Sequence, residues 1–112
     1  MEITAETSPN VTVVSISGTV DSGTAGALAT SLREHAGNGG SHLVADLAGV
    51  DYMSSAGLRA LLETVKEARQ RGGDLRLAGV QPNVLRVLDL SGFTKILKVF
   101  PDVAAAAASF PA

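Results

Sequence analysis

The hydrophobic and polar positions of the chain follow a two-residue period in some segments and a period of three to four residues in others. Short runs that are rich in β-branched or other apolar residues predict strands. These runs cover residues 2–7, 11–17, 42–47, 75–80 and 96–100. Ser8-Pro9-Asn10 joins the first two and is favourable turn chemistry, so we expect a hairpin there. Gly18 is expected to end the second strand.

Four other segments have the apolar spacing, or the start and stop signals, of helices. They cover residues from about 21 to 36, 54 to 71, 82 to 92 and 103 to 109. The segment 54–71 is the clearest, because its leucine, valine and alanine residues recur at steps of three and four. On its polar face, Arg59 and Glu63 have the i,i+4 spacing of an ion pair. Residues 37–40, Gly-Asn-Gly-Gly, are expected to be a flexible connector.

The resulting order of elements, β-β-α-β-α-β-α-β-α, predicts an α/β fold. Strands that alternate with helices favour a single layer of mostly parallel β-sheet. We expect four to five strands, with an N-terminal antiparallel hairpin, and about four α-helices. A length of 112 residues suits one domain, and no linker or internal repeat divides the chain. Residues 1–112 are therefore expected to form a single domain.

Composition and charge narrow the classes of function. Nine basic and eleven acidic residues give a net charge of -2, which argues against nucleic-acid binding. Since cysteine is absent, thiolate metal sites and cysteine nucleophiles are excluded. His35 and His42 lack ligand spacing and are expected to be ordinary surface residues, so we expect no metal and no cofactor. Without a long apolar run or a signal peptide, the chain is expected to be cytoplasmic and to bind no membrane.

Signatures of catalysis are also missing from the sequence. It contains no Ser/His/Asp pattern, no Walker motif and no Gly-x-Gly-x-x-Gly after a strand. Four acidic residues stand out: Asp21 and Asp46, which are expected to close strands, Asp51, and Asp102, which is expected to cap a helix. Paired carboxylates could serve acid–base chemistry, but roles as caps and turn formers explain them more simply. We therefore expect that the protein is not an enzyme.

Residues 46–58 are the most distinctive segment of the chain. We interpret them as a strand end, a loop, and then four consecutive small residues, Ser54-Ser55-Ala56-Gly57, that open the strongest helix. Partners and ligands usually meet a parallel sheet at the carboxyl ends of its strands, and this loop lies there. A cap accounts for one serine, but Gly57 lowers helix stability and has no such explanation. We expect these small residues to leave the backbone open to close approach by another protein.

The same segment is electrostatically suited to a phosphate. A helix N-terminus carries partial positive charge and unpaired amides, so it tolerates an anion. Phosphorylation would add a charge of about -1.5 to -2 without unravelling the helix. The residues alone leave two interpretations open, plain helix capping and a phosphoserine switch.

The stretch D-L-A-G-V-D-Y-M-S-S-A-G-L-R-A-L-L resembles the signature of STAS domains, specifically of bacterial anti-sigma factor antagonists. G-T-V-D at 18–21 and K-I-L-K-V-F-P-D at 95–102 support the resemblance, which spans essentially the whole chain. It implies that the unphosphorylated protein binds an anti-sigma factor, itself a serine kinase with a GHKL-type ATPase fold, and thereby frees the sigma factor. Phosphorylation would break this complex, and a PP2C-type phosphatase would restore it.

The resemblance also implies which residues act. Alignment places the phosphorylated residue at Ser55, with Ser54 as the alternative, and partner binding at Asp21, Ser54, Ser55, Ala56 and Gly57. Asp21 would orient the serine or meet basic groups of the partner. The chain departs from the commoner pattern Met-Asp-Ser-Ser/Thr-Gly-Leu, because Ser54 replaces the aspartate and Ala56 replaces the second hydroxyl. Modification directly before the glycine is therefore impossible.

Other functions remain open at this point. Related small STAS proteins are accessory subunits of lipid-transport ABC systems, in which they bind the ATPase subunit. The paired serines and the Ala-Gly-Leu that follows favour the sigma-factor pathway or another partner-switching cascade. A nucleotide-binding protein is a third option, but the sequence shows no phosphate-binding loop. The chain is expected to be a monomer or a weak dimer.

Overall fold

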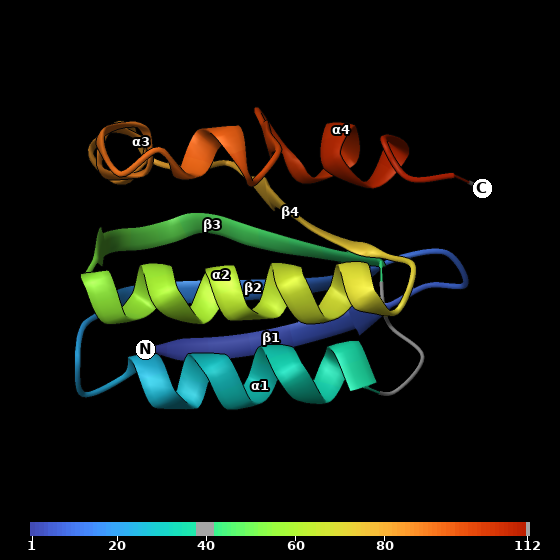
Figure 1. The fold of residues 1–112 in the computed structure, drawn as a ribbon, viewed down its shortest axis with the longest axis horizontal. Coiled ribbons are helices and arrows are strands. Elements are labelled where there is room, and N and C mark those ends of the chain that lie inside the picture. Colours follow the sequence, from blue (N-terminus) through green and yellow to red (C-terminus); the bar gives the residue numbers. More distant parts are fainter. Residues whose placement is uncertain (38–41, 112) are drawn as a thin grey trace.

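The structure is a computed structural model that describes residues 1–37 and 42–111 (Figure 1). Its strands are β1 (Glu2–Thr7), β2 (Thr12–Val20), β3 (His42–Met53), β4 (Asp74–Ala78) and β5 (Val99–Phe100). Its helices are α1 (Ala25–Gly37), α2 (Ser55–Gln70), α3 (Pro82–Leu90) and α4 (Val103–Ala108), with a 3₁₀ turn, η1, at Phe93–Lys95. The predicted order of strands and helices is confirmed. Most of the connector predicted at 37–40 lies outside the described residues.

The five strands form one sheet in the order β1-β2-β3-β4-β5. β1 pairs with β2 in antiparallel fashion, and the other three pairings are parallel. This arrangement confirms the predicted α/β class with its N-terminal hairpin. Because β2 and β3 run parallel, their carboxyl ends meet at the same edge of the sheet, where Val20 is in register with Met53.

Helices cover both faces of the sheet. α1 and α2 run side by side over one face, as Figure 1 shows. Their apolar residues at helical spacing are buried, except that Leu62 is only partly buried. Most of them share one core with the sheet. α3 joins the same core through Val84 and Leu88. α4 packs on the other face, where Ala106 and Phe110 contact the side chains of the strands.

Two strands are longer than predicted. β2 continues through Gly18 to Val20, and β3 continues past residue 47 to Met53, so the expected strand end and loop are wrong. The pairing of the two strands shifts register between Ser15 and Ser17 and again after Gly18, which marks bulges in β3. Gly18 has a φ of +99°, and a Cβ at Gly49 would lie 2.8 Å from the Cβ of Ser17. These glycines fit bulged pairing rather than strand ends.

Polar pairing on the helices also differs from the prediction. Glu63 does not pair with Arg59; its carboxylate instead contacts the guanidinium of Arg33 on α1 at 2.6 Å. Asp102 caps α4 as predicted, since its carboxylate accepts a 2.8 Å hydrogen bond from the amide of Ala105. The last predicted strand, 96–100, is reduced to the two residues of β5. The amides of Ile96 and Leu97 donate hydrogen bonds to the carbonyl of Phe93, so the chain after η1 is held in a turn and cannot pair with β4 there.

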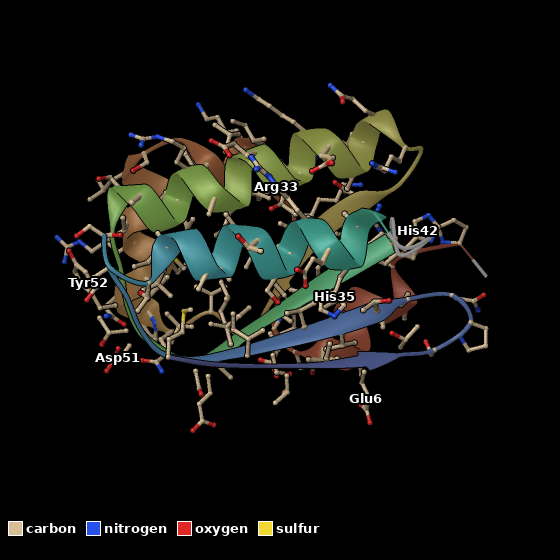
Figure 2. The ribbon with its side chains drawn as sticks, turned by 90° about the horizontal axis from the view of Figure 1, so that it is seen from below. Glu6, Arg33, His35, His42, Asp51 and Tyr52 are labelled. Atoms are coloured by element: carbon tan, nitrogen blue, oxygen red, sulfur yellow. The ribbon has the colours of Figure 1, made fainter. Side chains whose placement is uncertain are left out.

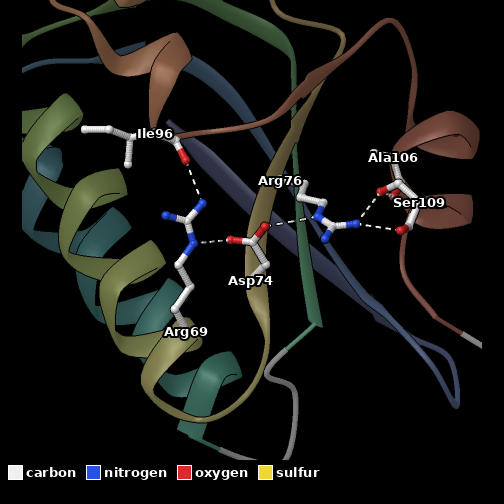
Figure 3. A network of polar contacts seen from close by, with 6 residues as sticks. All are labelled: Arg69, Asp74, Arg76, Ile96, Ala106 and Ser109. Atoms are coloured by element: carbon white, nitrogen blue, oxygen red, sulfur yellow. Dashed lines mark hydrogen bonds and ion pairs between the residues drawn. The ribbon is translucent and has the colours of Figure 1, made fainter.

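A network of ion pairs and hydrogen bonds stabilises the end of the sheet where β4 begins (Figure 3). The carboxylate of Asp74, which is only 6% exposed, accepts hydrogen bonds from Arg69 at 2.9 Å and from Arg76 at 3.1 Å. Arg69 also donates to the carbonyl of Ile96, and Arg76 donates to both oxygens of Ser109. The network therefore connects the end of α2, the start of β4 and the C-terminal helix.

The two histidines are part of the framework. The Nδ1 of His35 lies 2.7 Å from the carbonyl oxygen of Ser31, one turn earlier in α1. His42 stacks on Phe110 with ring centroids 4.8 Å apart, and Arg76 lies over the same ring. Both histidines are half-buried at the surface, and each is held by contacts within the fold.

Candidate functional site

The predicted site residues lie at the edge of the sheet where β2 and β3 end and α2 begins. The amide of Ser54 donates a 2.8 Å hydrogen bond to the carbonyl of Val20, so Asp21, the next residue, is brought beside the start of α2. Figure 2 shows Asp51 and Tyr52 at this same end of the molecule. Residues separated by more than thirty positions in the sequence thus share one surface.

The two serines have different structural roles. Ser54 is half-buried and caps α2: its hydroxyl accepts a 3.2 Å hydrogen bond from the amide of Gly57. Ser55 is the first residue of α2 and is exposed. Among the described residues, nothing forms a hydrogen bond with the Ser55 hydroxyl. One serine therefore stabilises the helix, and the other presents its hydroxyl to solvent.

Gly57 is buried, so its role differs from the one predicted. A Cβ at this position would clash with the sulfur of Met53 and would lie 2.7 Å from Cγ1 of Val20. The absence of a side chain allows α2 to approach the ends of β2 and β3 closely. The glycine is therefore required by packing inside the protein, and it does not leave backbone bare on the surface.

Asp21 organises the turn that leads into α1. Its Oδ1 accepts hydrogen bonds from the amides of Gly23 at 2.9 Å and Thr24 at 3.1 Å, and the amide of Asp21 donates to the Thr24 hydroxyl. This reciprocal pattern resembles a capping box. It forms a turn at 22–24, so α1 begins at Ala25 and not at about residue 21 as predicted. Within the described part of the chain, Oδ2 accepts no hydrogen bond, and Asp21 is exposed. Oδ2 is thus available to accept a hydrogen bond from a partner molecule.

The other two predicted acids differ in position. Asp51 lies at the site, where its carboxylate accepts a 2.9 Å hydrogen bond from Thr19 and its carbonyl accepts one from Asn83 at the start of α3. Asp46 is in the middle of β3 and does not close the strand as predicted. Its carboxylate accepts a hydrogen bond from the amide of Ala48, so it supports the irregular part of β3 at a distance from the serines.

Tyr52 is a surface residue that sequence reasoning missed. It lies in β3 just before the two serines, and 53% of it is exposed. The bulges in β3 place Asp51 and Tyr52 both at the surface, so a strict two-residue alternation does not predict this exposure. An aromatic residue three positions before Ser55 was the available signal, because exposed tyrosines are frequent at the centres of protein interfaces.

Beyond the serine site, two further kinds of feature could carry chemistry: hollows of the surface and groups of metal-binding side chains. An open hollow between α1 and α2 is lined by Arg33, Glu63, Lys66, Glu67 and Gln70, and Arg33 is paired there with Glu63. No group of histidine and acidic side chains in residues 1–37 and 42–111 is arranged to hold a metal. In that same part of the chain, no helix is long and apolar enough to cross a membrane.

Within residues 1–37 and 42–111, these observations define a five-stranded mixed sheet with four α-helices. One of these helices, α2, begins with small residues at the edge of the sheet. The model of the STAS domain family matches residues 2–106. The chain belongs to the STAS domain family, which confirms the resemblance found in the sequence.

Relatives and solved structures agree with this assignment. The Bordetella bronchiseptica protein named "Putative anti-sigma factor antagonist BtrV" is 36% identical over 110 residues, which are 98% of this chain and 95% of that protein. The anti-sigma-B factor antagonist of Listeria monocytogenes is 30% identical over 75% of this chain and 74% of its own. The crystal structure of an anti-sigma factor antagonist from Mycobacterium paratuberculosis has a TM-score of 0.88 at 28% identity, covering 96% of this chain and 92% of that one.

Proposed function

We propose that this protein is an anti-sigma factor antagonist that is switched by phosphorylation of Ser55. The names of its relatives support the class of function. The observation that carries the choice of residue is the division of roles at the start of α2, where Ser54 is the cap and Ser55 is exposed. SpoIIAA, which shares the fold at 16% identity, has been solved in an unphosphorylated and a phosphorylated form.

In the proposed mechanism, the unphosphorylated protein binds an anti-sigma factor that is also a serine kinase with a GHKL-type ATPase fold. The contact surface consists of Asp21, Ser54, Ser55 and Ala56, with Gly57 beneath it. The short side chains of Ser55 and Ala56 permit close approach of the kinase to the hydroxyl. The free oxygen of Asp21 offers an acceptor to basic groups of the partner. The protein is a substrate and binding module in this mechanism and performs no catalysis itself.

Phosphorylation would change this surface and leave the fold in place. The modified residue is the first of α2, where the partial positive charge of the helix tolerates an anion. The phosphate adds a charge of about -1.5 to -2 and considerable bulk at a close contact. A loss of about 4 kcal/mol of binding free energy lowers affinity roughly a thousandfold. Because Ser55 is exposed, a PP2C-type phosphatase can reach it and restore binding.

Ser54 is the less suitable phosphorylation site. Ser54 is half-buried, and its hydroxyl accepts a hydrogen bond from the amide of Gly57. Its own amide donates a hydrogen bond to the carbonyl of Val20. A kinase would have to displace the cap before it could position this hydroxyl. Modification at Ser54 would therefore disturb the start of α2, which modification at Ser55 does not require.

Capture of partners from the native host, followed by phosphosite mapping, tests the proposal. The captured anti-sigma factor is then titrated with wild type, Ser55→Ala, Ser55→Asp and Ser54→Ala. We expect Ser55→Ala to bind in all conditions and Ser55→Asp to bind poorly. Equal affinity of wild type, Ser55→Ala and Ser55→Asp would refute the switch, and phosphate on Ser54 alone would refute the site. Capture of an ABC ATPase by protein free of phosphate would favour the accessory-subunit function.

A further inference from the structure

Arg59 is an exposed cation on α2 whose expected partner is engaged elsewhere. The acid at the i+4 position, Glu63, forms its 2.6 Å ion pair with Arg33 of α1. Within residues 1–37 and 42–111, Arg59 forms no ion pair and no side-chain hydrogen bond. A guanidinium in this situation has donors available for another anion.

The geometry of α2 directs Arg59 toward Ser55. The two residues are four positions apart in the same helix, so they are neighbours on one face, with Cβ atoms about 5–6 Å apart. Side chains in a helix tilt toward its N-terminus, which points Arg59 back along the turn toward residue 55. Both residues are exposed, so no packing would prevent their contact.

The remaining cations of α2 are unsuited to this contact. Lys66 lies three turns from Ser55, and Arg69 is bound to Asp74 near the other end of the helix. Arg59 is thus the cation of α2 that is within one turn of the proposed phosphorylation site.

We propose that Arg59 is the intramolecular counter-ion of phosphorylated Ser55, a role that rests on the proposed function because it requires phosphate at that residue. The planar guanidinium can donate two hydrogen bonds to phosphate oxygens, and such charge-assisted pairs are the stronger class. The pair stabilises the phosphorylated form without the partner and neutralises a positive charge one turn from the contact surface. Phosphorylation then alters the surface twice, by adding an anion and by neutralising a cation.

The test installs phosphoserine at position 55 of the full chain during translation, so no kinase is needed. ³¹P NMR then follows the titration of the phosphate in the wild type and in Arg59→Gln. Since Arg59 favours the dianion, the second pKa of the phosphoserine is expected to be lower in the wild type. The second acid dissociation constant of the phosphoserine should be about twofold larger in the wild type than in Arg59→Gln, as expected for an i,i+4 ion pair. The difference should shrink in high salt.

Lys66→Gln is the matched control, because it removes one positive charge from the same helix at a greater distance. It should leave the titration at the wild-type position, and Arg59→Lys should lie between the wild type and Arg59→Gln. Identical titrations in the wild type and Arg59→Gln, or an equal effect of Lys66→Gln, would overturn the proposal. Partner affinity is measured separately, so a failed switch at Ser55 is distinguishable from a failed ion pair.

Discussion

The amide of Ser54 donates a hydrogen bond to the carbonyl of Val20, and this bond connects the start of α2 to the end of β2. It brings α2 so close to the sheet that Val20 and Met53 leave no room for a side chain at Gly57. The position of the exposed Ser55 hydroxyl therefore depends on the end of β2, on the Ser54 cap and on the absence of a side chain at Gly57.

Gly57→Ala should destabilise the protein, although alanine is the better helix former. The added methyl group would clash with Met53 and Val20, and overpacking of this kind costs about 1–3 kcal/mol. Gly26→Ala in α1 is the matched control, because a Cβ there meets nothing within 4 Å. It should raise the free energy of unfolding by roughly 0.5–1 kcal/mol. Urea unfolding of both variants measures the contrast, and a stabilised Gly57→Ala would contradict it.

The two adjacent serines should differ in their contribution to stability. Ser54→Ala removes the side-chain acceptor for the Gly57 amide and should lower the free energy of unfolding by about 1 kcal/mol. Ser55→Ala removes an exposed hydroxyl and should change it by less than about 0.5 kcal/mol. Thermal and denaturant unfolding can resolve this difference. Similar losses in both variants would show that the capping role is shared.

Tyr52→Ala should weaken binding to the anti-sigma factor while leaving the fold intact. The ring is 53% exposed beside the proposed contact surface, and tyrosine is enriched among the interface residues whose truncation lowers affinity about tenfold or more. Leu90, which is 79% exposed at the other end of α3, provides the control. Calorimetric titration should show lower affinity for Tyr52→Ala and unchanged affinity for Leu90→Ala. The reverse result would place the partner on another surface.

Asp74→Asn should be strongly destabilising. It removes a buried charge that receives hydrogen bonds from Arg69 and Arg76, and it leaves the largely buried Arg76 without an anion. We expect a loss of about 2 kcal/mol or more. Glu67→Gln breaks only the longer contacts with Arg33 and Arg71 at 4.0 and 3.6 Å and should cost less than about 0.5 kcal/mol. Equal unfolding midpoints for the two variants would contradict this interpretation of the network.

The periodicity of the sequence predicts the helices better than the ends of the strands. α1 and α2 each bury a continuous apolar stripe, which repeats in the sequence at the spacing of a helix. β2 and β3 could not be delimited in the same way, because their bulges interrupt alternation and place Gly18 and Gly49 within paired strands. A glycine that permits a bulge and one that ends a strand look the same in a sequence.

The candidate site was predictable as a segment but not as a set of individual roles. Each serine at a helix start is a possible cap, and only the structure shows that Ser54 is the one that accepts the Gly57 amide. The packing of Gly57 against Val20 depends on a contact between distant parts of the chain. The ion pair between Glu63 and Arg33 likewise depends on how α1 lies against α2. The i,i+4 spacing describes contacts within one helix and cannot predict it.

The separation of the helix cap from the exposed hydroxyl has a consequence for timing. In the proposed switch, phosphate added to Ser55 and later removed would leave the Ser54 cap in place, so neither step would require the start of α2 to unfold and refold. The rate of switching would then be set by the turnover of the kinase and the phosphatase, and no conformational change of this protein would limit it.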